Sequence, residues 1–323
     1  MESMGRRAPP ALSVDALSLT IGSVSVVDGV GFTVAPGEVM AIVGESGCGK
    51  SVTAQAIMRL LPSAIRQSAG SIRLGDDDIT GISERAMQAI RGRRMSMIFQ
   101  EPQAALDPLA TVGSQIAEAL RQPLSQARAA VLRMLEGVGI SDPERRIDQY
   151  PFELSGGMCQ RVMIASALIS RPAVLIADEP TTALDVTIQA QILDLLRRLA
   201  AERGTAVVLI THDMGVVADI ADRMAVMYAG RIAETGPTEA IFAAPRHPYT
   251  ALLLASIPRL SDSPKSALAV IEGRVPTPSE YGTGCRFANR CPLADDQCAA
   301  VTPPLRPIGP GRLAACHHAE AVA

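Results

Sequence analysis

The sequence predicts an α/β protein with a mostly parallel sheet, and three features of the chain support this fold class. Short apolar runs have the length and composition of buried strands: 39–43, 173–177 and 206–211. A helical pattern follows each of the first two runs, at 51–61 and 186–203, and Gly204 is placed to cap the second helix. The first run leads directly into a glycine-rich turn. Strands that alternate with helices favour parallel pairing.

The composition narrows the classes of function. The 323 residues allow one large domain with an appendage or two domains, and the apolar fraction of 48% supplies a substantial core. Basic and acidic side chains number 30 and 33, so the sequence shows no broad basic footprint for nucleic acid. Trp is absent and aromatic residues make up 3%, which argues against base-stacking platforms. We therefore expect no nucleic-acid partner.

The start of the chain and its hydropathy predict a cytoplasmic location. Two arginines near the start are not followed by an apolar run, so residues 1–10 do not resemble a signal peptide. No stretch approaches the roughly 18 apolar residues that a membrane span requires. A role at a membrane would therefore depend on a partner protein.

Changes in pattern along the chain predict its domain organisation. Residues 12–34 read as short strands of a small β region. Between 102 and 150 the pattern becomes helical, with prolines as breaks, and after Pro245 proline, glycine and cysteine become dense. We expect an N-terminal tail at 1–11, a main domain at 12–250 with a helical subdomain at about 102–160, and a C-terminal extension at 251–323.

The glycine-rich turn between the first strand and the first helix has the form of a phosphate-binding loop. Its residues are Gly44, Glu45, Ser46, Gly47, Cys48, Gly49, Lys50 and Ser51, followed by Val52. Glycines let backbone N–H groups converge on phosphate oxygens at the positive end of a helix. Lys50 is expected to reach the β- and γ-phosphates of a nucleotide, and the Ser51 hydroxyl to ligate Mg²⁺. The strand before the loop and the helix after it disfavour the alternative, an accidental glycine turn.

The second apolar strand ends in two carboxylates, Asp178 and Glu179. A buried strand has little reason to end in paired acids unless a cation or a reaction needs them. We expect Asp178 to hold the Mg²⁺ shell and Glu179 to be the catalytic base that polarises the attacking water. The alternative is a pair of helix-capping residues at a strand exit. In a chain that also holds a phosphate loop, a site for ATP and Mg²⁺ is the favoured interpretation.

A serine and two glycines open an apolar helical pattern: Ser155, Gly156 and Gly157, in a segment that continues to Gln160. The serine hydroxyl and the glycine N–H groups form a second anion site. One nucleotide does not need two such sites in one chain, whereas two facing chains can each close the other's nucleotide. We therefore expect these four residues to contact a nucleotide held by a second chain. The alternative is an ordinary serine helix cap.

The order and spacing of these segments resemble the nucleotide-binding subunit of an ABC transporter, from about residue 12 to the C-terminus. The resemblance implies a P-loop NTPase core of the RecA-like type, with an antiparallel β region and a helical subdomain, plus an irregular cysteine-rich C-terminal extension. It also assigns three further residues. Gln100 matches the Q-loop glutamine of the ATP site, which contacts Mg²⁺ and the membrane partner. Asp185 matches the D-loop aspartate, and His212 matches the catalytic switch histidine at a strand end.

Several further segments resemble the oligopeptide and dipeptide importer ATPases within that family. They are Asp178–Thr187, Gln189–Gln191, His247–Thr250, Ile257–Leu260 and the cysteine-bearing tail. This resemblance implies ATP hydrolysis that powers import of peptides or a related small solute through a membrane permease. Nickel and metallophore importers share these features, so nickel or a metallophore is an alternative cargo.

The resemblance also implies partners and a location. It predicts two integral-membrane permease subunits, a second ATP-binding subunit that is homologous or identical, and an indirect link to a solute-binding protein. The chain would then lie peripherally on the cytoplasmic face of the inner membrane.

Two rival classes of function remain open. A soluble ABC ATPase acting on ribosomes or DNA usually carries two cassettes or a long coiled-coil insertion. This chain has one cassette and no heptads between Gln100 and Leu154. A redox- or metal-sensing module would rest on the tail cysteines alone. Proteins that co-purify with the chain distinguish the three classes.

Three positions depart from the family pattern. Cys159 stands where the subfamily usually has Arg, which removes a positive charge near the second anion site. Ile21 stands near the place where the family usually stacks an aromatic ring on adenine, so we expect weak discrimination between ATP and GTP. Phe152 replaces a common His, with no expected chemical consequence.

Four cysteines in the C-terminal extension predict a bound metal centre: Cys285, Cys291, Cys298 and Cys316. Four thiolates suffice for a [4Fe–4S] cluster, and some relatives in the resembled subfamily carry one there. The dense prolines indicate little core, and small segments of this kind commonly need a metal or cross-links. Zinc and free thiols are the alternatives. Zinc sites more often show paired Cys-x-x-Cys, and a reducing cytosol disfavours disulfides.

Overall fold

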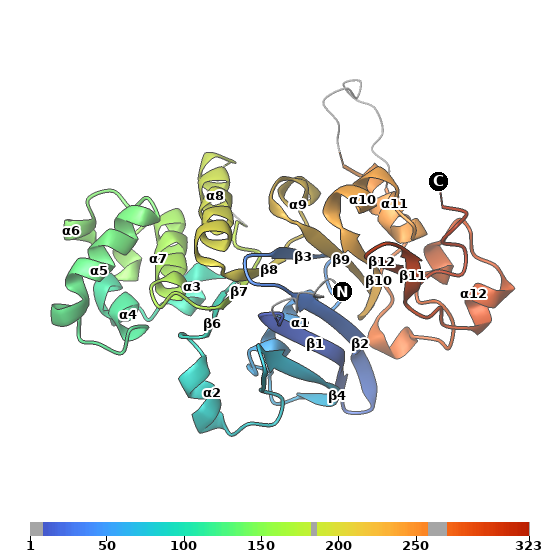
Figure 1. Ribbon diagram of the computed structural model, residues 1–323, viewed down its shortest axis with the longest axis horizontal. Helices are drawn as coiled ribbons and strands as arrows, with labels where there is room; N and C mark the ends of the chain where they lie inside the picture. The colour runs from blue at the N-terminus through green and yellow to red at the C-terminus, as the bar shows by residue number, and fades with distance from the viewer. Residues whose placement is uncertain (1–8, 182–185, 258–269, 323) are drawn as a thin grey trace, which may run out of the picture. The chain divides into compact units, whose positions relative to one another are not determined.

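The computed structural model describes residues 9–181, 186–257 and 270–322, in two compact units that are taken one at a time below (Figure 1). The first unit comprises Met1–Leu12, Thr33–Val39 and Arg73–Ile210. The second comprises Ser13–Phe32, Met40–Ile72 and Thr211–Ala323. Each unit therefore gathers segments that are distant in the sequence.

Three parallel strands form the sheet of the first unit: β6 (Met95–Ile98), β7 (Val174–Asp178) and β8 (Ala206–Ile210). Val174 is paired with Met95 on one side and with Ala206 on the other. Every residue of these strands is buried, which is the burial expected of parallel strands covered on both faces. The two strands predicted here from apolar runs are confirmed to within one residue at each end.

Helices make up most of the remainder of the first unit (Figure 1). They are α2 (Glu84–Ile90), α3 (Pro102–Ala105), α4 (Val112–Glu118), α5 (Leu124–Gly137), α6 (Pro143–Arg146), α7 (Gly156–Leu168) and α8 (Val186–Arg203), with a 3₁₀ turn, η1 (Pro151–Glu153). Pro123 precedes α5 and Pro143 begins α6, so the prolines mark helix starts where the missing N–H costs nothing. Helix α7 packs against α3, α4 and α5, and most of its residues are buried.

The second unit contains a mixed sheet in the order β11-β12-β10-β9-β3. Strands β3 (Val39–Val43) and β9 (Arg223–Tyr228) are parallel, and β10 (Arg231–Pro237) runs antiparallel to β9. Strands β11 (Arg306–Gly309) and β12 (Arg312–Ala314) come from the C-terminal extension, and β12 pairs with β10. The extension is therefore less irregular than the sequence indicates, because its short strands gain partners only in the folded chain.

A separate group of strands lies in the order β2-β1-β4: β1 (Leu12–Ile21), β2 (Val24–Val34) and β4 (Ile65–Leu74). The last residues of β4 pair antiparallel with β5 (Asp77–Asp78). These strands form the β region predicted for residues 12–34, extended by β4, which the sequence pattern did not reveal.

The helices of the second unit are short: α1 (Lys50–Ile57), α9 (Met214–Ile220), α10 (Thr238–Ala243), α11 (Pro248–Ala255) and α12 (Asp296–Ala300), with two 3₁₀ turns, η2 (Pro278–Glu280) and η3 (Ala288–Arg290). Three buried rings form the centre of a core beside them. Tyr228 of β9, Tyr249 of α11 and Phe287 of the extension lie with ring centroids 4.6–5.3 Å apart. The extension thus shares a core with the body of this unit.

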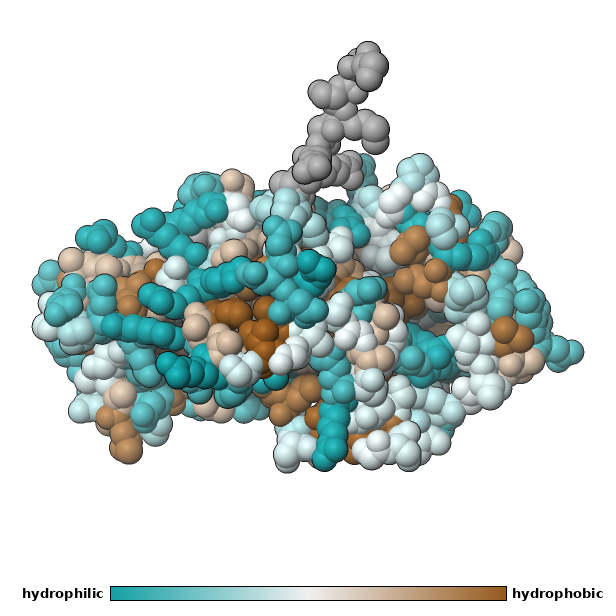
Figure 2. Space-filling model, turned by 60° about the horizontal axis from the view of Figure 1, so that its bottom comes forward, coloured by the Kyte–Doolittle hydropathy of each residue, from teal (hydrophilic) through white to brown (hydrophobic). Residues whose placement is uncertain are grey.

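The surface carries both polar and apolar side chains. Figure 2 shows a face on which hydrophilic residues predominate and apolar residues gather in patches. Among the described residues, no helix combines the length and the apolar character needed to span a bilayer.

Candidate functional site

The predicted phosphate loop connects β3 to α1 in the second unit. Gly44, Gly47 and Gly49 all have positive φ angles, and Gly49 is the residue that precedes the helix. A Cβ on Gly44 would collide with the carbonyl of Met227, so this glycine permits a close approach of two backbones. The N–H of Gly230 donates to the Cys48 carbonyl at 2.9 Å, which ties the loop to the turn after β9.

Lys50 is buried and folds back over the loop. Its Nζ donates to the carbonyls of Gly44 at 2.7 Å and Glu45 at 3.0 Å, and it lies 3.7 Å from the Cys48 sulfur. Burial raises the pKa of the Cys48 thiol, with Lys50 opposing that effect. The ammonium group is therefore held at the loop, within reach of a phosphate chain that the N–H groups would bind. Ser51 is half-buried at the first turn of the helix.

His212 follows the buried Thr211 at the start of the second unit's last segment. The N–H of Thr211 donates to the carbonyl of Ile42 in β3, which fixes this stretch directly beside the strand that enters the phosphate loop. Asp213 caps α9 through bonds from the N–H groups of Gly215 and Val216. The His212 side chain is exposed.

The paired carboxylates lie at the end of β7 in the first unit. Asp178 is buried, whereas Glu179 is half-buried and has a φ of 47°, which is unusual for a residue other than glycine. The N–H of Glu179 donates to the carbonyl of Ile210 at 2.9 Å, and its Oε2 accepts from Nε2 of Gln100 at 3.1 Å. The structure therefore brings together two of the predicted residues, Glu179 and Gln100. The backbone of Glu179 is also held in a conformation that costs free energy.

The second predicted anion site lies at the start of α7, also in the first unit. Ser155 precedes the helix and its Oγ accepts from the N–H of Met158 at 3.4 Å. Ser155 and Gly156 are exposed. Gln160 is buried instead, and its amide donates to the carbonyl of Pro180 just after the paired carboxylates. Of the four residues expected here, Ser155 and Gly156 are thus accessible to a ligand and Gly157 is half-buried. Gln160 instead links the helix to the turn that follows Glu179.

The departures from the family pattern occupy different environments. Cys159 is buried and its thiol donates to the carbonyl of Pro151 at 3.3 Å, so its side chain faces the interior of the unit. Burial raises the pKa of this thiol. Phe152 is exposed and stacks on Tyr150, and Ile21 at the end of β1 is 45% exposed. The predicted D-loop residue, Asp185, lies outside the described residues.

Two parts of the chain match known protein families. Residues 27–182 match the ABC transporter family, and residues 233–298 match the C-terminal region of oligopeptide/dipeptide transporters. The dipeptide transport ATP-binding protein DppD of Escherichia coli strain K12 is 47% identical over 315 residues, which cover 95% of this chain and 96% of that protein. The chain belongs to the ABC transporter ATP-binding proteins of the oligopeptide/dipeptide family.

Further relatives support this assignment. DppD of Bacillus subtilis strain 168 is 52% identical over 287 residues, covering 87% of this chain and 85% of that protein. Among solved structures, the dimeric bacterial ABC transporter cassette MJ0796 has a TM-score of 0.64 and 26% identity over 70% of this chain and 98% of that one. The same cassette in a post-hydrolysis state, bound to ADP and Pi, has a TM-score of 0.63 with the same identity and coverage.

The cysteines of the C-terminal extension are gathered by the fold of this ABC ATP-binding protein. Cys298 and Cys316 are buried and Cys285 and Cys291 are half-buried. Burial raises the pKa of all four thiols, that of Cys316 to about 11, and the charges of the other three thiols add to this rise. The pKa of Cys316 is thus influenced by three thiols that lie up to 31 positions before it in the sequence.

One backbone N–H group donates to a sulfur of this group. The N–H of His318 donates to the Cys316 sulfur at 3.3 Å. Backbone hydrogen bonds from Phe287 and Ala288 act on Cys285 and lower the pKa of its thiol, against the larger effect of burial. A hydrogen bond of this kind favours the thiolate form that binds a metal, whereas burial favours the neutral thiol.

Two further metal-binding side chains join this region, and the sequence pattern did not identify them. A carboxylate oxygen of Asp295, the Cys298 sulfur and a ring nitrogen of His318 all lie within 4.8 Å of one another. The His318 Nε2 is 3.1 Å from a carboxylate oxygen of Asp295. The wide spacing of Asp295 and His318 in the sequence hides this group, and only the fold reveals it.

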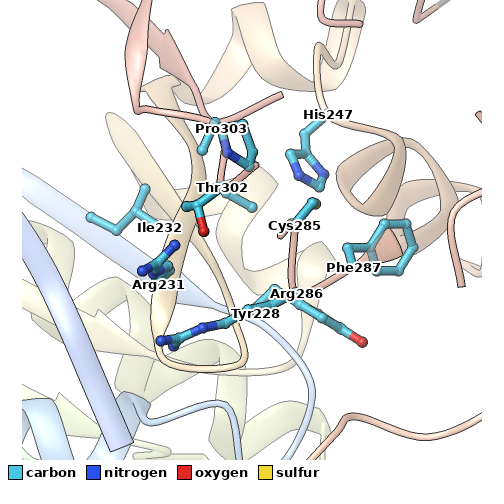
Figure 3. A pocket seen from close by; sticks show the side chains of 11 residues that line it. Tyr228, Arg231, Ile232, His247, Cys285, Arg286, Phe287, Thr302 and Pro303 are labelled. Carbon is cyan, nitrogen blue, oxygen red and sulfur yellow. The ribbon is translucent and has the colours of Figure 1, made fainter. Parts of the chain in front are cut away.

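The sequence pattern also missed side chains that surround the phosphate loop. The Tyr249 hydroxyl accepts from the N–H of Glu45 at 2.9 Å, and Arg290 of the extension bonds to the Glu45 carboxylate. Tyr249 belongs to the His247–Thr250 segment, which the resemblance had marked only as typical of the subfamily. Figure 3 shows neighbouring side chains of this region, with His247 directed toward Cys285 and Phe287.

Proposed function

We propose that this chain is the ATP-hydrolysing subunit of an ABC importer that carries peptides across a membrane. One observation carries the hydrolytic part of the proposal. Glu179 is held at the strand end by the Ile210 carbonyl and accepts a hydrogen bond from Gln100, so its carboxylate is oriented rather than free to rotate. A positioned carboxylate beside a metal-ligating aspartate suits a general base for water attack.

The roles of the nucleotide-binding residues follow from their positions. The N–H groups of Gly44 to Ser51 and Val52 would surround the phosphates, with Lys50 neutralising their charge. The Mg²⁺ ligands would be Ser51, Asp178 and Gln100. His212 would act on the γ-phosphate. We also propose the domain division expected from the sequence: an N-terminal tail at 1–11, a nucleotide-binding domain at 12–250 with a helical subdomain at about 102–160, and an extension at 251–323.

The exposed start of α7 supports a paired assembly. Ser155 and Gly156 face outward, where they suit a nucleotide bound by a second, homologous or identical cassette, with Gly157 and Gln160 completing the segment. The solved cassette MJ0796, 26% identical, is described as dimeric. The chain would bind two permease subunits at the cytoplasmic face of the membrane and receive cargo through a solute-binding protein.

Peptides are the cargo class that the relatives favour. Both DppD proteins are described as dipeptide transport proteins, and the match to the oligopeptide/dipeptide C-terminal region lies outside the nucleotide loop. Nickel or a metallophore remains the second cargo class. Uptake of labelled dipeptides and of nickel by a strain that expresses the chain with its permease distinguishes the two.

A [4Fe–4S] cluster held by Cys285, Cys291, Cys298 and Cys316 is our proposal for the extension. It is supported by four buried or half-buried thiols in one segment and by the His318 N–H that donates to the Cys316 sulfur. When bound, such a cluster would cross-link a segment that is poor in core. The grouping of Asp295, Cys298 and His318 favours a second candidate, a zinc ion. Anaerobic purification decides between them: about four irons with sulfide per chain supports the cluster, and stoichiometric zinc supports the alternative.

The substitution Glu179→Gln tests the hydrolytic role. The amide cannot accept the proton of the attacking water, so we expect turnover to fall by about 10² or more while ATP binding persists. ATP hydrolysis is measured in the assembled transporter, and equilibrium ATP binding serves as the control for folding. Hydrolysis at the wild-type rate by Glu179→Gln would reject the assignment.

A further inference from the structure

The phosphate loop is held by a residue of the C-terminal extension. The Arg290 guanidinium donates from Nη1 to Oε2 of Glu45 at 2.7 Å and from Nη2 to Oε1 at 3.0 Å. This is a two-point contact, which gives an Arg–carboxylate pair directional strength. The Arg290 side chain is 5% exposed and the Glu45 side chain 30%, so water reaches the pair only from the Glu45 side.

Arg290 is itself fixed in place by the extension and by β9. Its remaining N–H groups donate to the carbonyls of Glu272 at 2.8 Å and Ile271 at 3.0 Å, and Nη1 also donates to the Tyr228 hydroxyl at 3.3 Å. Because these partners occupy the fork from several sides, the guanidinium presents a rigid pair of donors to Glu45. A pair held in this way loses little side-chain entropy when it forms.

The backbone of Glu45 is held by a second group. Its N–H donates to the hydroxyl of Tyr249, whose ring is fully buried among Tyr228 and Phe287. Glu45 is thus restrained at both its side chain and its peptide. The carbonyl of the same residue accepts from Lys50 Nζ, so the backbone of Glu45 is coupled to the position of the lysine of the phosphate loop.

Arg290, which binds the phosphate loop through Glu45, lies between Cys285 and Cys291 in the sequence. Arg290 ends the turn η3 and directly precedes Cys291, while Phe287 follows Cys285 by two positions. The N–H of Ala288 donates to the Cys285 carbonyl at 3.0 Å, and the N–H of Cys291 donates to the Ala288 carbonyl at 3.3 Å. The conformation of this turn, and with it the place of Arg290, therefore depends on the order of the cysteine-bearing segment.

We propose that Arg290 is a positioning residue for ATP binding, through which the cysteine-bearing extension holds the phosphate loop in its nucleotide-binding shape by way of Glu45. The proposal rests on ATP binding by this loop, as described under the proposed function. It gives the extension a role in the ATPase itself, because a change that disorders the turn between Cys285 and Cys291 also releases the loop.

Equilibrium binding of a fluorescent ATP analogue with Mg²⁺ to the purified full-length chain tests this proposal. Arg290→Ala removes both bonds to Glu45, and we expect the dissociation constant to rise on the order of tenfold. Arg290→Lys keeps the charge but loses the fork, so it should give an intermediate rise. In the assembled transporter, both variants should raise the KM for ATP and change kcat much less.

Glu45→Gln removes the charge from the loop side and leaves the extension intact, so it guards against a general failure of Arg290→Ala to fold. The double variant Glu45→Gln/Arg290→Ala should bind ATP no more weakly than Arg290→Ala alone, because both changes break one interaction. The matched control is Arg274→Ala, which breaks an exposed Arg–Glu pair with Glu280 in the same extension and should leave the dissociation constant unchanged.

The outcomes are distinct. Wild-type affinity in Arg290→Ala and in Glu45→Gln would overturn the positioning role while leaving ATP binding established. Additive losses in the double variant would also overturn it, because the two residues would then act separately. Failure of the wild-type chain to bind the ATP analogue would overturn the proposed function and this proposal together. A rise in dissociation constant confined to the Arg290 and Glu45 variants, without additivity, supports it.

Discussion

Two helices of this protein begin with glycines and a hydroxyl-bearing residue, and they differ in how much of the anion site each one builds. The loop before α1 is largely enclosed by its own unit: Lys50 is buried on the loop carbonyls, and Tyr249 and Arg290 hold Glu45. At the start of α7, Ser155 caps its own helix and Gly156 is exposed. The first start is supported from within the chain, whereas the second faces outward.

Similar local sequences have different surroundings at these two helix starts. Both helix starts offer N–H groups to an anion. The loop before α1 adds a buried cation and a backbone that only glycine at position 44 can adopt, and we propose that it binds the phosphates of ATP. The start of α7 offers a shallow site that needs a ligand presented from outside. We infer that the two starts serve one nucleotide from opposite cassettes.

The largest expected effects, on turnover and on ATP binding, come from introducing a side chain at Gly156 or at Gly44. Gly156→Asp places a carboxylate where we expect a partner-bound phosphate, and an added Cβ there meets no atom within 4 Å. We expect turnover in the assembled transporter to fall by about 10² while ATP binding by the isolated chain persists. Gly44→Ala should instead abolish binding, because its Cβ meets the Met227 carbonyl.

Gly156→Ala is the control for these changes, since it adds the same Cβ without the charge. It should retain most of the turnover, as measured by phosphate release. Loss of ATP binding by the isolated Gly156→Asp chain would show that the start of α7 serves its own nucleotide, and the proposed division between the two helix starts would be wrong.

An intermediate effect is expected on the stability of the folded chain at low pH, because of the buried His247 next to the phosphate loop. Burial lowers the pKa of His247 to about 4 from 6.5, and its Nδ1 accepts from the N–H of Tyr249, which in turn contacts the loop. His247 takes up a proton near pH 6.5 in the unfolded chain and only near pH 4 in the folded chain. The contribution of His247 to the free energy of unfolding is therefore fully present above pH 6.5 and is lost as the pH falls. The loss amounts to roughly 2 kcal/mol between about pH 7.5 and about pH 5.

Urea unfolding at the two pH values measures this loss. His247→Asn keeps an acceptor at the helix start and removes the titration, so the difference between the two pH values should shrink by that amount. An unchanged pH dependence in His247→Asn would show that other groups cause it.

The smallest expected effect concerns the base of the nucleotide. Ile21 is 45% exposed and offers no aromatic face, so stacking worth about 1–3 kcal/mol per base is missing if this residue meets adenine. We expect ATP to be preferred over GTP by less than about a hundredfold, and Ile21→Tyr to tighten ATP binding by roughly tenfold. Competition binding measures both, with Ile21→Leu as the control. A larger preference in the wild-type chain would mean that another residue supplies the ring contact.

Local sequence determined the nucleotide segments of this protein, because each depends on residues that are neighbours in the chain. The strand–glycine–helix order around Gly44 to Ser51 follows from backbone freedom and apolar runs. The strand ending at Asp178 and the helix opening at Gly156 follow in the same way from short patterns. The cysteines were visible as a group because four thiols in one segment of a long chain are unusual.

Only the tertiary structure decided which distant residues meet these segments. Gln100 reaches Glu179 across 79 positions, Arg290 reaches Glu45 across 245, and His318 joins Asp295 and Cys298 through the fold of the extension. Residues 312–314 form the strand β12 because they pair with β10 in the folded chain. Such contacts leave no periodic trace in the sequence, since they depend on how separate elements pack and on which buried charges find partners.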